Sequence, residues 1–397
     1  MIDHGAPRPG GAHFRAARSA AAFLAGARVA HRSVAAVDAL GAIVYATAMA
    51  HIRLALAALL VFAACASKPS TVALVDAESA TGPRHLVFYA HERERIREAA
   101  FLGNPRLCGA QLKYTWRELE PQEGEYAFDG IRRDLAFLEA NGKALWIQLQ
   151  DVTFDERKPV PDWLCTEAYG GGAARKYEGD EKPETEDVFD GWVARRWDPR
   201  VQARFAQLLA ALGREFDGAI LGLNLAETAI GFGDVEAKWP EGFTPARYAE
   251  AVKENVSAAK AAFSKSHVVL YANFLPGEWL PWDDKGYLKG VHAHCAKVGA
   301  GVGGPDLRPL AKGQQTHILP LLRARKEGVV AALAVQDGNL DEIDKATGRA
   351  MTVQDLLRIA ETDLRLDYVF WGTQEPHFTA AVLPALAAES ARAAAPR

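Results

Sequence analysis

The sequence predicts an α/β fold in which eight parallel strands and their helices close into a single-domain (β/α)8 barrel. Short apolar runs, of the length typical of buried parallel strands, alternate with stretches that have helical spacing. Eight such alternations follow one another over roughly 300 residues, which favours a closed barrel. An open doubly wound sheet is the alternative, but no GxGxxG follows the first run and no P-loop pattern is present.

The expected strands share a short apolar stretch with turn-forming or polar residues at its ends. In chain order they are His85–Ala90, Cys108–Tyr114, Ala144–Gln150, Ala219–Leu225, His267–Asn273, Gly299–Asp306, Val329–Gln336 and Asp367–Trp371.

The expected helices between these strands are marked by start signals. They include Gly130–Asn141, Val201–Phe216, Tyr248–Phe263 and Val353–Leu364. Asp198 and Thr244 each precede a proline, which is the usual order of an N-cap and a first helical residue. Thr352 is followed three residues later by Asp355, which is close to a capping box.

One connection is much longer than the others. It runs over residues 151–197 after the third strand and contains three consecutive glycines and an acidic run. Connections on that side of a barrel surround the active-site mouth, so we expect either a cleft wall or lid, or a solvated insertion.

The first 64 residues do not read as part of the barrel. Residues 1–48 predict an upstream extension, and residues 49–64 have a positive start, ten apolar residues and a small-residue end, the layout of a secretory signal. Phe62-Ala63-Ala64-Cys65 resembles a bacterial lipoprotein signal. That resemblance implies lipid attachment at Cys65, a tether over residues 65–83 and an outer-membrane location. The barrel predicted from the alternating runs then spans residues 84–390. An ordinary cleaved signal or a membrane-anchored N-terminus is the alternative.

The composition limits the classes of partner that the chain is expected to bind. The chain is 49% hydrophobic and 24% charged, with a formal charge of −4. Removing residues 1–64, which hold six Arg and two Asp, shifts that charge to −8, which argues against nucleic acid. Cys108, Cys165 and Cys295 would remain, without metal-ligand spacing. We expect neither a metal nor a cofactor, and nothing in the sequence indicates an oligomeric state.

The most specific segment follows the second strand. It contains Trp116, Glu120-Pro121, Gly124, Tyr126 and Phe128, and a helix and a Leu-Trp-Ile-Gln-Leu strand come after it. This pattern resembles the superfamily of TIM-barrel glycoside hydrolases that includes β-galactosidases and cellulases. The resemblance implies a carbohydrate substrate. It also suggests a structural role for Glu120, with the flat face of Trp116 turned to a sugar ring.

Glu227 is the first candidate for a catalytic acid, because it ends the fourth apolar run, where a carboxylate has no packing role. In the resembled superfamily the proton donor is a Glu directly after an Asn at this place. Here Asn224 and Glu227 are separated by two residues, so in a regular strand they would face opposite ways. The alternative is a buried carboxylate in a structural hydrogen-bond network.

A glycosidase usually needs a second carboxylate, and one of the pair should have a raised pKa. The resemblance places the nucleophile at the end of the seventh strand, where this chain has the amide Gln336. The remaining candidates, in order of preference, are Glu375 after the eighth strand, Asp306 after the sixth, and Asp337.

Other polar and aromatic residues at strand ends predict a site for a neutral, hydroxyl-rich ligand, since a phosphorylated one would call for more Lys and Arg. Besides Trp116, the expected substrate-binding residues are Lys113, Gln148, Asn224, Tyr271, Asn273, Gln336, Trp371 and His377, and Trp279 and Trp282 could extend an aromatic platform. The sequence therefore predicts a glycoside hydrolase. A non-catalytic carbohydrate-binding lipoprotein on a degenerate barrel and a polysaccharide lyase remain as alternatives.

Overall fold

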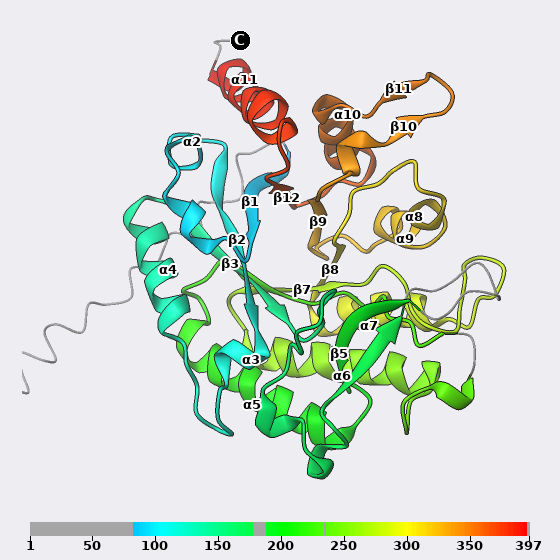
Figure 1. Cartoon of the computed structure of the whole chain (residues 1–397). Helices are drawn as coiled ribbons and strands as arrows, with labels where there is room; N and C mark the ends of the chain where they lie inside the picture. The colour runs from blue at the N-terminus through cyan, green and yellow to red at the C-terminus, as the bar shows by residue number, and fades with distance from the viewer. Residues whose placement is uncertain (1–81, 178–187, 234–235, 395–397) are drawn as a thin grey trace, which may run out of the picture. The chain divides into compact units, whose positions relative to one another are not determined.

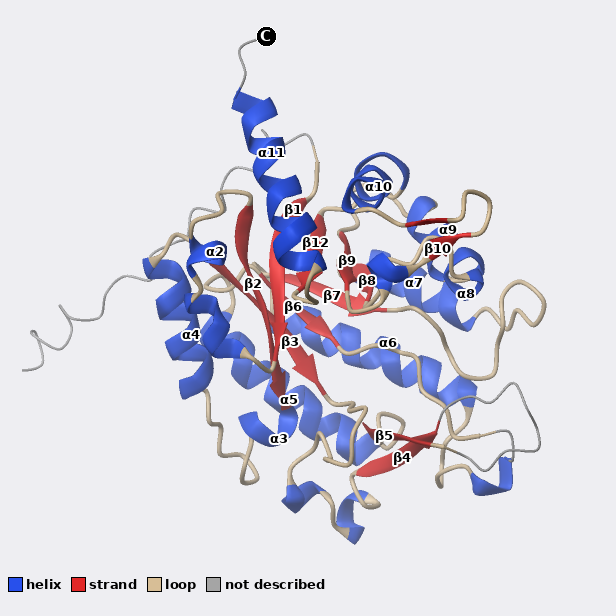
Figure 2. Ribbon diagram, turned by 45° about the horizontal axis from the view of Figure 1, so that its top comes forward, coloured by secondary structure: helices blue, strands red, loops and turns tan. Residues whose placement is uncertain are grey.

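The structure, a computed structural model, describes residues 82–177, 188–233 and 236–394. These residues form a closed barrel of eight parallel strands with helices around it (Figures 1 and 2). The barrel strands are β1 (Arg84–Ala90), β2 (Leu107–Thr115), β3 (Ala144–Gln150), β6 (Gly222–Leu225), β7 (His267–Tyr271), β8 (Gly301–Gly304), β9 (Ala331–Val335) and β12 (Tyr368–Gly372). The predicted (β/α)8 barrel is thus confirmed, and all eight expected strands are present, several of them shorter than expected.

The helices follow the capping signals. The α-helices are α2 (Ala99–Leu102), α3 (Trp116–Leu119), α4 (Asp129–Ala140), α5 (Pro199–Phe216), α6 (Pro245–Ala262), α7 (Tyr287–Val298), α8 (Lys312–Thr316), α9 (Ile318–Arg323), α10 (Val353–Arg358) and α11 (Leu383–Ala394). Asp198 and Thr244 cap α5 and α6 through their side chains, and Thr352 forms a capping box with Asp355. Shorter 3-10 turns span Arg93–Arg97, Asp162–Leu164, Glu167–Tyr169, Glu236–Lys238 and Asn339–Asp341, and π-helical turns span Ile359–Asp363 and Phe378–Val382.

The barrel interior is filled by aromatic rings rather than left as a pore. Trp146 of β3 packs against Tyr368 and Phe370 of β12, with ring centroids 5.0 Å apart in both pairs. Gly222 makes room for this indole, because a Cβ there would lie 2.7 Å from it. The packed interior closes the barrel below and leaves the carboxyl ends of the strands as the place for a site.

The long connection after β3 folds into a hairpin. Strands β4 (Ala173–Tyr177) and β5 (Phe189–Ala194) pair antiparallel, and β5 returns to the barrel beside Val152. Tyr177 and Asp190 of this hairpin line a cavity at the barrel mouth, so the described part of the connection is a cleft wall. A second small hairpin pairs β10 (Ile343–Asp344) with β11 (Arg349–Ala350).

The predicted upstream extension, signal and tether, including Cys65, lie outside the described residues, apart from the end of the tether at residues 82–83. Within the described ranges, no helix is long and apolar enough to span a membrane. The three cysteines of the barrel, Cys108, Cys165 and Cys295, are free thiols.

Candidate active site

An extra residue at the end of β6 turns Glu227 into the barrel mouth. The β6–β7 ladder runs in register with Leu225 opposite Leu270. Continued regularly, it would bring the N–H of Glu227 to the carbonyl of Tyr271, but the N–H of Thr228 makes that bond at 3.0 Å. The additional residue reverses the alternation of side chains, as in a bulge. Glu227 and Asn224 therefore face the same side, which corrects the expectation for a regular strand.

The carboxyl group of Glu227 accepts a hydrogen bond from an amide. Asn273 donates a hydrogen bond from Nδ2 to Glu227 Oε2 at 2.9 Å. Burial raises the pKa of Glu227 to about 7; the charge of Asp306 adds to the rise, whereas Asn273, Lys176 and Arg196 oppose it. A carboxyl group with such a pKa can hold a proton near neutral pH and give it to a substrate.

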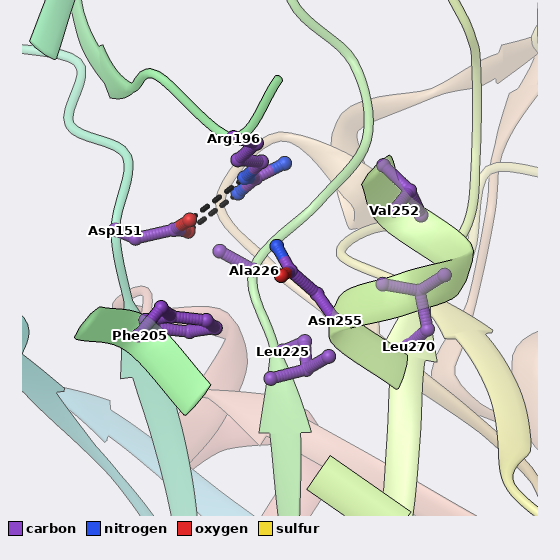
Figure 3. Close-up of a pocket in the computed structure, with 8 residues that line it drawn as sticks. All are labelled: Asp151, Arg196, Phe205, Leu225, Ala226, Val252, Asn255 and Leu270. Carbon is purple, nitrogen blue, oxygen red and sulfur yellow. Dashed lines mark hydrogen bonds and ion pairs between the residues drawn. The ribbon is translucent and has the colours of Figure 1, made fainter. Parts of the chain in front are cut away.

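The guanidinium nearest to Glu227 is bound to a different carboxylate. Arg196 donates from Nε to Asp151 Oδ2 at 2.7 Å and also bonds the second carboxylate oxygen. Figure 3 shows this pair beside the end of β6, around an enclosed space of about 10 Å³. Arg196 meets Glu227 only through the backbone, donating to its carbonyl at 2.8 Å. The cation therefore fixes the chain at Glu227 without forming an ion pair with its side chain.

Asp306 is the carboxylate that shares the electrostatic environment of Glu227. It follows β8 and accepts a hydrogen bond from Asn339 Nδ2 at 3.0 Å. Burial raises the pKa of Asp306, while the bond from Asn339 and the charge of Arg308 lower it. Both Asp306 and Glu227 raise the pKa of Tyr271, whose own burial is the larger cause. Tyr271 is thus within electrostatic reach of both carboxylates.

The other candidate partners lie elsewhere. Glu375 is exposed and accepts a hydrogen bond from the hydroxyl of Thr379, at the start of a helical turn. It is not among the described residues that line the cavities at the mouth. Asp337 is exposed but lines the same cavity as Asp306. The geometry therefore reverses the expected order and favours Asp306 over Glu375.

Two cavities open at the mouth, one for each carboxylate. The larger, of about 580 Å³, includes Glu227 in its wall and extends past β5 and the loops after β6 and β7. The smaller, of about 380 Å³, includes Asp306 and lies near the ends of β1, β2, β9 and β12. Lys113 lines the smaller cavity, and its charge also reaches Glu227. Burial lowers the pKa of Lys113, and the negative charges of Glu227 and Asp155 oppose this.

A layer of amides and a phenol supports the mouth from below. Gln111 donates from Nε2 to Asn224 Oδ1 at 2.9 Å and to the hydroxyl of Tyr271 at 2.8 Å. Trp146 also donates to Asn224 Oδ1, at 3.2 Å. Asn224 is fully buried, so it supports the floor and does not itself reach the cavity.

Two more amides face the same end of the barrel. Gln148 of β3 is buried in register with Lys113 and Asn224, and its Oε1 has no hydrogen-bond partner among the described residues. Gln336 lines the smaller cavity, and its Nε2 donates to the carbonyl of Pro305 at 2.8 Å. This bond holds Gln336 beside Asp306.

Besides Asn224, three more of the expected substrate-binding residues are corrected by the structure. Trp116 is fully buried against Phe205 and donates its indole N–H to Glu120, which gives Glu120 the expected structural role. Trp371 is buried on the outer side of β12 and donates to His85 Nδ1 at 3.1 Å. The Nε2 atom of His377 lies 2.9 Å from Asp341 Oδ1. His377 is not among the described residues that line either cavity at the mouth. The aromatic character of both Trp residues serves core packing.

The structure adds site residues that the sequence analysis missed. Gln111 was detectable, because it lies two positions before Lys113 and so shares its face of the strand. The aromatic wall of the larger cavity, with Phe232, Trp239 and Phe243, comes from an irregular loop without a periodic signal. Among the described residues, no group of His, Cys, Asp or Glu side chains is arranged to hold a metal ion.

Comparisons with known proteins give likenesses in structure only. No protein-family model and no curated protein matches the sequence. Similar solved structures include GH5_18 from Streptomyces cattleya in complex with GlcNAc, with a TM-score of 0.45 and 14% identity over 74% of this chain and 71% of that one. Endo-glycoceramidase II from Rhodococcus sp. has a TM-score of 0.41 and 12% identity, over 74% and 73%. A psychrophilic glycoside hydrolase family 10 endo-beta-1,4-xylanase has a TM-score of 0.42 and 12% identity, over 73% and 86%.

Proposed function

We propose that the protein is a glycoside hydrolase in which Glu227 is the proton donor and Asp306 is the second carboxylate. The observation that carries the proposal is the raised pKa of Glu227 at a barrel mouth where Asp306 is within electrostatic reach. Glycosidic cleavage requires a carboxyl group that stays protonated next to a second carboxylate. Lys113 and Gln336, near Asp306, offer hydrogen bonds to sugar hydroxyls.

The experiment is hydrolysis of a panel of p-nitrophenyl glycosides and labelled oligosaccharides by the wild type, Glu227→Gln and Asp306→Asn. Loss of a general acid typically lowers the rate by about 10²–10⁴-fold, and we expect a loss of this size for Glu227→Gln. Glu375→Gln is the matched control and should retain activity. Full activity of Glu227→Gln on every cleaved substrate would remove Glu227 from the mechanism.

A non-catalytic carbohydrate-binding protein is the second candidate, and Gln336 at the end of the seventh barrel strand is the observation that favours it. Calorimetric binding of an oligosaccharide from the panel, without turnover by the wild type, would support this candidate instead. An unsaturated sugar among the products would indicate a lyase that uses Glu227 as a base.

We also propose that the mature chain begins at a lipidated Cys65 and is tethered to a bacterial outer membrane. The support is the Phe62–Cys65 segment after the apolar run. Labelling cells with a palmitate analogue should mark the wild type but not Cys65→Ser. Equal labelling of both would contradict the anchor.

A further inference from the structure

The two mouth cavities differ in chemistry. Several described residues of the smaller one carry polar or charged groups, among them Glu92, Lys113, Asp306, Gln336 and Asp337. The larger one is lined mainly by aromatic and aliphatic side chains, among them Phe154, Ile230, Phe232, Phe243, Phe274 and Trp279. A substrate that occupies both cavities therefore meets a polar environment at one end and an apolar environment at the other.

The aromatic wall of the larger cavity is rigid. Phe232 and Phe243 pack edge to face with centroids 4.7 Å apart, and each also contacts Trp197 edge to face. Trp239 continues this set, 5.4 Å from Phe243. In the loop after β7, the rings of Phe274 and Trp279 stack with their centroids 5.8 Å apart and their planes at 11°. Because these rings hold one another in place, the apolar wall is pre-formed.

Several polar groups of the larger cavity already have partners within the protein. Glu278 accepts the backbone N–H groups of Tyr287 and Leu288 at the start of α7. Asp190 is ion-paired with Lys176, and the indole N–H of Trp239 donates to the carbonyl of Gly233 at 2.8 Å. These three groups are therefore committed to holding the walls and are less available to the hydroxyls of a second sugar.

The positions of the two carboxylates orient the substrate, if the proposed function holds. In hydrolysis the bond from the anomeric carbon to the glycosidic oxygen breaks and its electron pair stays on the oxygen. That oxygen takes the proton of Glu227, and water supplies the hydroxyl group to the carbon and a proton back to the enzyme. The leaving group must therefore extend on the Glu227 side, into the larger cavity, while the sugar occupies the Asp306 side.

From this we infer that the preferred substrate is a glycoside with an apolar leaving group, such as an alkyl chain or an aryl ring, held by the aromatic wall of the larger cavity. The inference rests on the proposed function and adds the class of the leaving group. Burial of apolar surface against Trp279 and Phe274 supplies the binding free energy.

The test compares two substrates with the same sugar, the one cleaved fastest in the panel: its octyl glycoside and its disaccharide. Wild type should have the higher kcat/KM on the octyl glycoside. Trp279→Ala should lower that value by about tenfold, or 1.4 kcal/mol, through KM, with a smaller effect on the disaccharide. The structure does not bear out Trp282 as part of an aromatic platform, because its side chain is 66% exposed and lies outside the described cavity lining. Trp282→Ala, in the same loop as Trp279, is therefore the matched control and should change the hydrolysis of neither substrate.

A second readout avoids turnover. Octyl glycoside titrated into Glu227→Gln should bind about tenfold more weakly when Trp279→Ala is added. Equal kcat/KM on both substrates, or equal losses in Trp279→Ala, would overturn the inference while leaving the hydrolase proposal intact. Unchanged hydrolysis by Glu227→Gln would instead contradict the proposed function.

Discussion

Two carboxylic acids, Asp151 and Glu227, lie beside Arg196, and their surroundings differ. Asp151 is 3% exposed and receives two charged hydrogen bonds from the guanidinium. The side chain of Glu227, at the next strand end, accepts a neutral hydrogen bond from Asn273. A carboxylate whose oxygens are held by a guanidinium is committed to the structure, whereas burial beside an amide partner raises the pKa of Glu227. Arg196 thus binds the side chain of Asp151 but meets Glu227 only at its backbone carbonyl.

The largest expected effect comes from breaking the ion pair between Asp151 and Arg196. Asp151→Asn leaves the buried guanidinium of Arg196 without its counter-charge, and we expect the free energy of unfolding to fall by about 3–5 kcal/mol. Urea denaturation measures it. Asp162→Asn is the matched control, because Asp162 pairs with Arg117 at the surface, and it should cost less than about 1 kcal/mol. Equal losses in the two variants would contradict the contrast.

Replacing the carboxyl group of Glu227 by a neutral amide should stabilise the protein at alkaline pH. Folded Glu227 keeps its proton up to about pH 7, whereas an ordinary Glu loses it near 4.5, so the folded state binds more protons between these values. Stability contributed by this group is therefore lost as the pH rises through that window. Glu227→Gln should be more stable than wild type at pH 8, by up to about 3 kcal/mol, and equal to it at pH 4.

The check is the thermal midpoint at both pH values, with Glu375→Gln as the exposed control that should show no such difference. A Glu227→Gln variant less stable than wild type at pH 8 would argue that the carboxylate is structural. That outcome would also remove the contrast with Asp151.

The pH dependence of activity sharpens the comparison further. As a proton donor, Glu227 should give a kcat/KM that falls as the pH rises above about 7. Asn273→Ala removes the hydrogen bond that lowers the pKa of Glu227, so the alkaline limb of the profile should move to higher pH. Asn255→Ala, beside the Asp151 pair, should leave the limb in place. An unmoved limb in Asn273→Ala, with the fold intact by circular dichroism, would exclude Glu227 as the titrating group.

The smallest effect concerns the indole of Trp116, which directly follows β2. Trp116→Phe removes one of several hydrogen bonds to Glu120, which still accepts the N–H of Gly124 and pairs with Arg204. We expect a loss of about 1 kcal/mol in urea denaturation and no change in KM for any cleaved substrate. A raised KM without a loss of stability would return Trp116 to the cleft.

The sequence alone determined the barrel and pointed to a candidate acid at its mouth. Apolar runs and capping residues are local signals, so the eight strands and the starts of α5, α6 and α10 could be read from neighbouring residues. The end of the fourth strand pointed to Glu227 for the same reason.

Only the tertiary structure decided what surrounds that acid. The extra residue before Thr228, the use of Arg196 by Asp151, and the nearness of Asp306 each depend on contacts between segments far apart in the chain. Trp116 and Trp371 show the same limit, because an indole suits a sugar ring and a core equally well, and its burial depends on what packs over it. The local sequence therefore determines on which strand or helix a side chain lies, whereas packing determines which side chains meet in the mouth of the barrel.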